Sequence, residues 1–230
     1  MNRLLTVQNC KIIKGNSKGY KTLILHLAPT ATSGYQVCPF SSPGCRAGCL
    51  HTAGQGRYYR VHLARVKRTR LWFEKPAAFK YLVRQDLDSL IRHCEKHKMK
   101  PAVRLNGTSD IDWAKVWPEL FRLYPTVQFY DYTKDYRRVF RKQPPNYYLL
   151  FSRSENTQKK QIDKCIANGV NVYCVFSAIP RSFLGYPVHN GDKNDLRFLD
   201  HPGIIGVTPK GRAKHDKTGF VIRQGTKLLT

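Results

Sequence analysis

Acidic side chains are scarce in this sequence. Fifteen Asp and Glu residues stand against 40 Lys and Arg residues in a chain of 230, which gives a formal net charge of +25. This imbalance disfavours cationic partners and indicates a polyanionic one, and nucleic acid is the polyanion that basic proteins bind through its phosphates. The alternative is a basic surface without a specific partner. We expect a nucleic-acid partner, and charge alone does not distinguish DNA from RNA.

Long apolar runs are also missing. No stretch approaches the roughly 18 residues that a membrane-spanning helix requires, and the segment MNRLLTVQNCKIIKGN lacks the apolar core and cleavage site of a secretory signal. We therefore expect no membrane partner and a cytoplasmic protein whose thiols stay reduced. The sequence contains no Walker A loop, no G-x-S-x-G, no H-E-x-x-H and no G-x-G-x-x-G after a strand, so the chemistries that depend on these motifs are poorly supported.

Linkers, internal repeats and low-complexity segments are absent as well. Hydrophobic residues make up 41% of the chain, which is enough for one domain with a sizeable core. We expect a single domain over residues 1–230. Its parts are an N-terminal extension that forms a short hairpin (1–20), a core (21–209) and a basic C-terminal segment (210–230).

Within the core, short apolar segments alternate with amphipathic ones. Six strands are expected at residues 21–29, 101–107, 126–133, 146–152, 170–176 and 203–209, and a further one at 219–223. Helices are expected at residues 59–73, 77–97, 113–125, 134–142 and 156–169, the last with Asn156 as its N-cap. This alternation indicates an α/β fold with a parallel sheet, either open or closed into an incomplete barrel.

Three of the seven cysteines lie in one loop, CPFSSPGCRAGC, at positions 38, 45 and 49. An odd number of cysteines in a reducing compartment argues against a disulfide framework, so ligation of a metal or cluster is the better interpretation. One alternative is zinc bound by the three thiolates and His51. The other is a 4Fe–4S cluster held by the three thiolates alone, with one iron open. Cys10 is a less favoured fourth ligand, and core packing is expected for Cys94, Cys165 and Cys174.

Basic and aromatic residues are interleaved in GRYYRVHLARVKRTRLWFEK, residues 56–75. Residues 135–142 and 210–217 repeat the pattern. Cationic side chains bind phosphates, and aromatic rings stack on bases. The candidate nucleic-acid-binding residues are therefore Arg57, Arg60, Arg65, Lys67, Arg68 and Arg70.

Polar segments follow the expected strands, at the ends where parallel sheets place their ligand sites. The segment NGTSDID follows the second strand, and DYTKD includes the end of the third. We interpret Asn106, Ser109, Asp110 and Asp131 in these segments as pocket residues, and Asp112 as a helix cap. Asp110 and Asp131 could also bind Mg²⁺ in a nuclease, which is one alternative function.

A three-cysteine loop directly after the first core strand of a six-unit β/α chain resembles the radical S-adenosylmethionine (radical SAM) superfamily. The resemblance implies a partial (β/α)6 TIM-like barrel and a 4Fe–4S cluster ligated by Cys38, Cys45 and Cys49. It also implies S-adenosylmethionine at the open iron, with cofactor-binding residues after the second strand: Asn106, Gly107 and Asp110. Both gaps between the cysteines are longer than in the superfamily's C-x3-C-x2-C.

A second resemblance covers nearly the whole chain. The segments CPFSSPGCRAGCLHTAG, RLNGTSD, FYDYTKD, FSRSEN and HNGDKNDLRFLD are similar to the bacteriophage family called gene product 88. This implies a phage-encoded protein that works in the host bacterial cytoplasm. We therefore expect a radical-SAM-like iron–sulfur protein that acts on nucleic acid or binds it. The sequence leaves open whether it is a radical-SAM-type enzyme. The alternative is a non-catalytic nucleic-acid-binding protein with structural zinc or an inert cluster.

Overall fold

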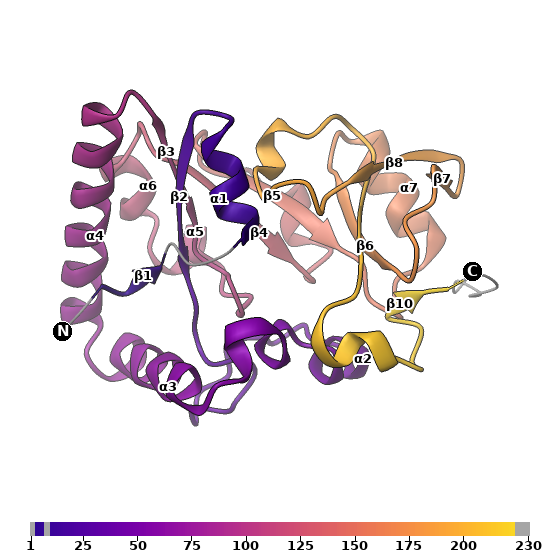
Figure 1. Ribbon diagram of the computed structural model, residues 1–230, viewed down its shortest axis with the longest axis horizontal. Coiled ribbons are helices and arrows are strands. Elements are labelled where there is room, and N and C mark those ends of the chain that lie inside the picture. The colour runs from indigo at the N-terminus through magenta and orange to yellow at the C-terminus, as the bar shows by residue number, and fades with distance from the viewer. Residues whose placement is uncertain (1–2, 7–9, 224–230) are drawn as a thin grey trace.

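A mixed sheet of ten strands forms the centre of the fold (Figure 1). The computed structural model describes residues 3–6 and 10–223. Within these ranges the strand order is β1-β2-β3-β4-β5-β6-β9-β8-β7, and β10 pairs with β6 outside this path. The strands are β1 (Leu5–Thr6), β2 (Tyr20–Leu25), β3 (Lys100–Arg104), β4 (Gln128–Thr133), β5 (Tyr147–Ser152), β6 (Val172–Phe176), β7 (Ser182–Phe183), β8 (Tyr186–Asn190), β9 (Ile204–Val207) and β10 (Val221–Ile222).

The parallel part of the sheet follows the order of the sequence. Strands β2 to β6, then β9 and β8, pair in parallel with their neighbours. Strands β1 and β7 pair antiparallel at the two ends, and the sheet is not closed. The predicted α/β fold with a mostly parallel sheet is confirmed, and all six expected core strands are present. Because these strands run in one direction, the loops that follow them meet at one edge, which we call the carboxyl edge.

Helices bury one face of the sheet. Strand residues Leu23, Leu25 and Phe129 pack with Phe79 and Leu87 of α4 in the main core, because side chains alternate between the faces of a strand and recur every three to four residues on a helix. Within the described ranges, no helix is both long enough and apolar enough to span a membrane. The α-helices are α1 (Cys10–Asn16), α2 (Pro43–Ala47), α3 (Tyr59–Glu74), α4 (Pro76–Lys96), α5 (Trp113–Val116), α6 (Glu119–Leu123) and α7 (Lys159–Ala167). The 3₁₀ turns are η1 (Leu50–Thr52), η2 (Gly54–Arg57), η3 (Arg138–Phe140), η4 (Arg197–Leu199) and η5 (Gly211–His215).

The opposite face of the sheet carries polar and aromatic side chains. Asp195, in the connection between β8 and β9, accepts hydrogen bonds from Tyr130 Oη (3.0 Å) and Tyr132 Oη (2.9 Å). The same carboxylate pairs with Arg104 Nη1 at 3.3 Å. This connection therefore lies over β3 and β4, on the face of the sheet opposite α4.

Several elements differ from the sequence-based expectation. Residues 10–16 form α1, so the expected N-terminal hairpin is wrong, and β1 pairs with β2 instead. The helix expected at 113–125 divides into α5 and α6, because Pro118 pushes Trp117 out of the helical region (φ −150°, ψ 61°). Residues 134–142 form only the turn η3. Helix α7 begins at Lys159, where Gln158 and Gln161 form a capping box, and not at Asn156.

Candidate metal centre

The three clustered cysteines lie on the loop that crosses the carboxyl edge between β2 and α3. Cys38 precedes α2, Cys45 lies within α2, and Cys49 is the N-cap of η1. Ser42 begins α2: its Oγ accepts a hydrogen bond from Cys45 N (3.1 Å), and Pro43 occupies the first turn. The local sequence thus folds a single helical turn that fixes the backbone around Cys45.

Glu155, in the loop after β5, holds this turn against the rest of the protein. Its carboxylate accepts hydrogen bonds from Ser42 Oγ (2.6 Å) and from Gly44 N (2.7 Å). A Cβ added at Gly44 would lie 2.6 Å from Phe220 Cβ, so only glycine allows α2 to approach the C-terminal segment this closely. Cys45 packs in the same small apolar cluster as Ala213 and Phe220. The cysteine loop is therefore enclosed by residues that are distant in the sequence.

Cys38 contacts the segment that follows β3. Its Sγ accepts a hydrogen bond from Thr30 N (3.4 Å) and donates one to Thr108 O (3.7 Å). The backbone N–H of Asp110 donates to Val37 O at 2.7 Å. The structure thus brings the predicted ligand Cys38 into contact with the segment that contains Asn106, Gly107 and Asp110.

The three thiols share one electrostatic environment. Burial raises the pKa of Cys38 to about 12, and negative charge on Cys49, Asp110 and Cys45 adds to the rise. Burial also raises the pKa values of Cys45 and Cys49. Lys134 opposes this rise in the pKa of Cys45, and Arg65 opposes it in the pKa of Cys49. The thiols are therefore protonated at neutral pH unless a bound metal displaces their protons.

Helix α3 places a buried cation beside this loop. Thr69 fixes the helix to the end of β2, because its Oγ1 accepts a hydrogen bond from Ala28 N (2.9 Å) and donates to Arg65 O (2.9 Å). Arg65 lies on the same inward face, and its side chain is only 6% exposed. Its Nε and Nη1 are buried without a hydrogen-bond partner among the described residues. Burial lowers the pKa of Arg65, and negative charge on Cys49 opposes this shift.

Two histidines near Arg65 also have unpartnered ring nitrogens. Nδ1 of His26, just after β2, and Nδ1 of His51 are buried without a hydrogen bond in the part of the chain that the structure describes. Burial, together with positive charge on Arg65, Arg104 and Arg68, lowers the pKa of His26 to about 3. An unpaired buried cation is costly, and an iron–sulfur cluster held by thiolates is a soft, electron-rich group with hydrogen-bond-accepting sulfurs. The three thiols and the Arg65 guanidinium therefore fit such a group.

The described side chains do not form a ready-made site for a single metal ion. No group of three or more His, Cys, Asp or Glu side chains within residues 3–6 and 10–223 is arranged to hold one metal ion. Thiolates around one Zn²⁺ lie about 4 Å apart, since each Zn–S bond is about 2.3 Å long, whereas the ligands of a cluster bind different irons. His51 lies in η1, close to Cys49 in the sequence. The side chain of Cys10 lies outside the described residues.

The segment after β3 is held by its own hydrogen bonds. Asn106 is 2% exposed, and its Nδ2 donates to Ile111 O (2.9 Å) and Asp131 Oδ2 (3.2 Å). Its Oδ1 accepts from Ser109 Oγ (2.8 Å) and from Trp113 Nε1 (3.1 Å). Asn106 therefore shapes the segment beside Cys38. Its direct contact with a cofactor remains a prediction.

Replacing Gly107 by alanine is expected to destabilise the protein by about 1–3 kcal/mol. The new Cβ would lie 2.5 Å from His26 Nδ1 and 2.7 Å from Leu25 O, the carbonyl to which Gly107 N is bonded at 2.9 Å. The midpoint of urea unfolding measures the effect. Gly15→Ala is the matched control, because its nearest neighbour, Leu196, is 3.5 Å away. Equal midpoints for Gly107→Ala and wild type would show that β2 and this segment can separate freely.

A chain of hydrogen bonds joins Asp110 to Asp131. Arg138 Nη1 lies 3.0 Å from Asp110 Oδ1, and Arg138 Nη2 donates to Tyr147 Oη at 2.9 Å. Tyr147 Oη donates in turn to Asp131 Oδ2 (2.9 Å). Asp110 also accepts from Lys134 N at 2.8 Å. Protein donors already engage both carboxylates, so this geometry does not favour the magnesium-dependent nuclease alternative.

Asp131→Asn is expected to change how stability depends on pH. Burial raises the pKa of Asp131 to about 7, so between about pH 4 and 7 the folded protein holds a proton that the unfolded chain releases. The free energy of unfolding of the wild type therefore falls as pH rises through this window, and the variant lacks this loss. We expect the stability of the variant relative to wild type to rise by up to about 4 kcal/mol from pH 4 to pH 8.

Urea unfolding at a series of pH values measures this difference between Asp131→Asn and wild type. The exposed Glu119→Gln provides a control with the same change in charge. A stability difference for Asp131→Asn that stays constant across the range would contradict the expected titration.

The remaining described cysteines lie in the core, as expected. Cys94 on α4, Cys165 on α7 and Cys174 on β6 are all buried in the main apolar cluster. They are therefore suitable controls for experiments on the three loop cysteines.

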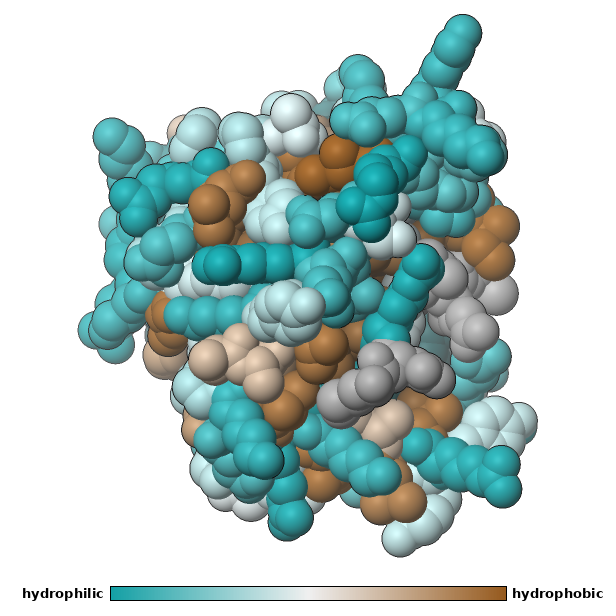
Figure 2. Space-filling model, turned by 90° about the vertical axis from the view of Figure 1, so that its left-hand side faces the viewer, coloured by the Kyte–Doolittle hydropathy of each residue, from teal (hydrophilic) through white to brown (hydrophobic). Residues whose placement is uncertain are grey.

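The predicted basic segment divides into surface and buried residues. Arg57, Arg60, Lys67 and Arg70 are exposed around η2 and α3, next to exposed Tyr58 and Tyr59. Arg68 is half-buried, and Arg65 is buried beside the cysteine loop, so Arg65 does not belong to the exposed surface. Figure 2 shows the side of the molecule that carries α4, where hydrophilic residues cover most of the surface. We call the four exposed residues the basic face of α3.

Comparisons with known proteins identify one relationship. No curated protein and no solved structure matches the chain, so these comparisons give no support to the resemblance to radical SAM enzymes. A family described as gene product 88 matches residues 3–224, nearly the whole chain. The predicted resemblance to this family is confirmed. The protein therefore belongs to the gene product 88 family, a family of phage gene products.

Proposed function

We propose that this protein binds a 4Fe–4S cluster through Cys38, Cys45 and Cys49. The observation that carries the proposal is the convergence of three partly buried thiols beside Arg65, a buried cation without a carboxylate partner among the described residues. When bound, such a cluster supplies electron transfer, and an iron without a protein ligand can bind an outside molecule. In this proposal Arg65 balances the charge of the thiolates, and Glu155 keeps α2 in place.

The strand order supports a more specific architecture. The sequential arrangement β2-β3-β4-β5-β6-β9 is the one that a partial (β/α)6 barrel requires, and the cysteine loop follows its first strand. We propose S-adenosylmethionine as the ligand of the open iron on this basis. Asn106 and Gly107 would then act by shaping the segment that contacts Cys38. Asp110, which is joined to Arg138, would fix the same segment to β4.

Anaerobic purification followed by iron and sulfide analysis tests the cluster. We expect about four irons and four sulfides per chain and a broad absorption band near 400 nm that bleaches on reduction. A colourless protein with one tightly bound zinc would overturn the proposal and leave the loop as a structural zinc clip. Addition of S-adenosylmethionine to the cluster-loaded protein should perturb its electron paramagnetic resonance spectrum, a readout that does not depend on turnover.

We also propose that the protein binds nucleic acid in the host cytoplasm. The net charge of +25 and the exposed cations and tyrosines of η2 and α3 support this part of the function. Three residues of the basic face of α3, Arg60, Lys67 and Arg70, lie on the helix that carries Arg65, so a strand bound there would pass close to the cysteine loop.

A further inference from the structure

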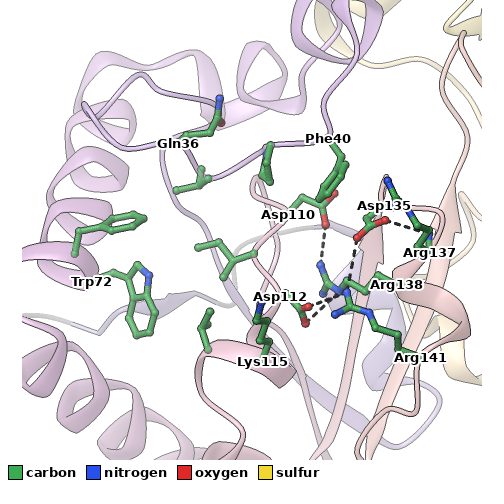
Figure 3. A pocket seen from close by; sticks show the side chains of 15 residues that line it. Gln36, Phe40, Trp72, Asp110, Asp112, Lys115, Asp135, Arg137, Arg138 and Arg141 are labelled. Carbon is green, nitrogen blue, oxygen red and sulfur yellow. Dashed lines mark hydrogen bonds and ion pairs between the residues drawn. The ribbon is translucent and has the colours of Figure 1, made fainter.

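A pocket of about 590 Å³ lies next to the cysteine loop (Figure 3). Val37 and Pro39, the neighbours of Cys38 in the sequence, line it, together with residues of α3, of α5 and of the segments after β3 and β4. This volume is within the range of small-molecule sites, about 300–1,000 Å³. The pocket is distinct from the three thiols and shares one wall with their loop.

One side of the pocket is aromatic. Phe73, on α3 beside Trp72, is 41% exposed. Phe40 lies across the pocket near Asp110 (Figure 3) and is 49% exposed. Both fractions are high for such large apolar side chains. Tyr35 stacks on Phe73 with ring centroids 4.4 Å apart and an interplanar angle of 5°. Trp72 also lines the pocket and packs edge-on against Trp113 at 4.9 Å. These contacts hold Phe73 and Trp72 in place before any ligand binds.

The other side is charged, and most of its charges are paired. Asp112 pairs with Arg141 Nη2 at 2.9 Å, and Asp110 pairs with Arg138. Lys115 and Arg137 form no ion pair with an acid in the part of the chain that the structure describes, although Arg137 N donates to Asp135. Figure 3 shows Trp72 on one side of the pocket and Arg137 with Arg141 on the opposite side. The pocket therefore combines an aromatic wall with two cations that have no acidic partner.

We propose that this pocket binds one nucleotide unit, with its base between Trp72 on one side and Phe40 on the other and its phosphate near Lys115 and Arg137. A base offers a flat π-face to the aromatic wall, and a phosphate supplies the negative charge that the two cations lack. A purely apolar ligand would leave these cations unused. The inference rests on the proposed nucleic-acid binding and identifies where a base is held. The unit can belong to a single strand or be a free nucleotide.

Tryptophan fluorescence provides a direct test. Trp72 is partly exposed and lines the pocket, whereas Trp113 and Trp117 are buried. Saturable quenching is expected with either deoxyadenosine monophosphate or a single-stranded oligonucleotide of about ten residues, and Trp72→Phe should abolish it. Quenching by the oligonucleotide alone would assign the site to a strand, and quenching by the mononucleotide would assign it to a free nucleotide.

Two pocket variants test the contacts themselves. Phe40→Ala and Arg137→Ala are each expected to weaken binding by about 5- to 100-fold. Arg122→Ala, which removes an exposed arginine from α6, should change it less than about twofold. Unchanged circular dichroism and unfolding midpoints establish that the variants are folded.

The outcomes separate this inference from the proposed function. Oligonucleotide binding without quenching, equally strong in Phe40→Ala, Arg137→Ala and Arg122→Ala, would overturn the pocket and leave nucleic-acid binding intact. A protein that binds no nucleic acid or nucleotide at all would overturn both.

Discussion

Alanine at any of the three loop cysteines is expected to remove most of the bound iron. Cys38, Cys45 and Cys49 each supply one thiolate in the proposed site, and the structure offers no fourth cysteine nearby among its described side chains. With one thiolate missing, one more iron loses its protein ligand and the cluster becomes exposed to loss. We expect iron per chain to fall by at least about fivefold and the absorption near 400 nm to disappear.

The matched controls are Cys94→Ala and Cys174→Ala. Both remove a thiol from the main core, at the cost of a small cavity, and both should retain the full iron content. Iron content that falls equally in all five variants would indicate loss through destabilisation of the fold, and would contradict the assignment of the three loop cysteines as ligands. Full iron in Cys45→Ala would contradict it directly.

Removal of the basic face of α3 is expected to have the second largest effect. The variant carries alanine at the four exposed positions of this surface: Arg57, Arg60, Lys67 and Arg70. The logarithm of the binding constant K falls with the logarithm of the salt concentration, and each phosphate contact on a single strand contributes about 0.7 to the magnitude of this slope. Loss of four contacts therefore reduces the magnitude of the slope by about 3. At 0.1 M salt this corresponds to an affinity about 1,000-fold weaker. A salt titration of oligonucleotide binding measures both quantities.

A second quadruple variant controls for net charge. It removes four exposed cations from α4 and α6, which leaves the same total charge: Arg84, Arg92, Lys96 and Arg122. If location matters, this variant should keep the slope of the wild type within about 1. Equal losses in the two variants would show that binding follows overall charge, and the assignment of the interface to α3 would then be wrong.

The sheet could be predicted from the sequence because its strands are short, apolar and bounded by polar turns. Residues 126–133 and 146–152, for example, contain β4 and β5 entirely. Helices α3 and α4 were also predicted within three residues at each end. The fold of the N-terminal segment was predicted wrongly as a hairpin, because Gly15 and Gly19 indicated a turn. Gly15 instead lies in α1, where it packs against Leu196.

The site was predictable only in part. Its three cysteines lie close together in the sequence, whereas the residues that enclose them come from distant segments. The spacing of the cysteines marked the loop, but nothing in the sequence indicated that Glu155 caps α2 or that Arg138 pairs with Asp110. Arg65 was placed on the exposed surface because it lies in a run of cations. Arg65 and Thr69 are four residues apart, so they lie on the same face of α3, and this face points inward. This spacing could have indicated that Arg65 is buried.

The contact between Glu155 and α2 has a consequence for the order of assembly. Ser42 and Glu155 are 113 residues apart in the sequence, and Phe220 follows later still. During synthesis the three cysteines therefore leave the ribosome long before the residues that enclose them. Their thiols stay open to solvent until β5 has joined the sheet and β10 has paired with the end of β6. For the proposed cluster, closure of the C-terminal segment over Cys45 would separate a stage in which iron enters from one in which it is retained.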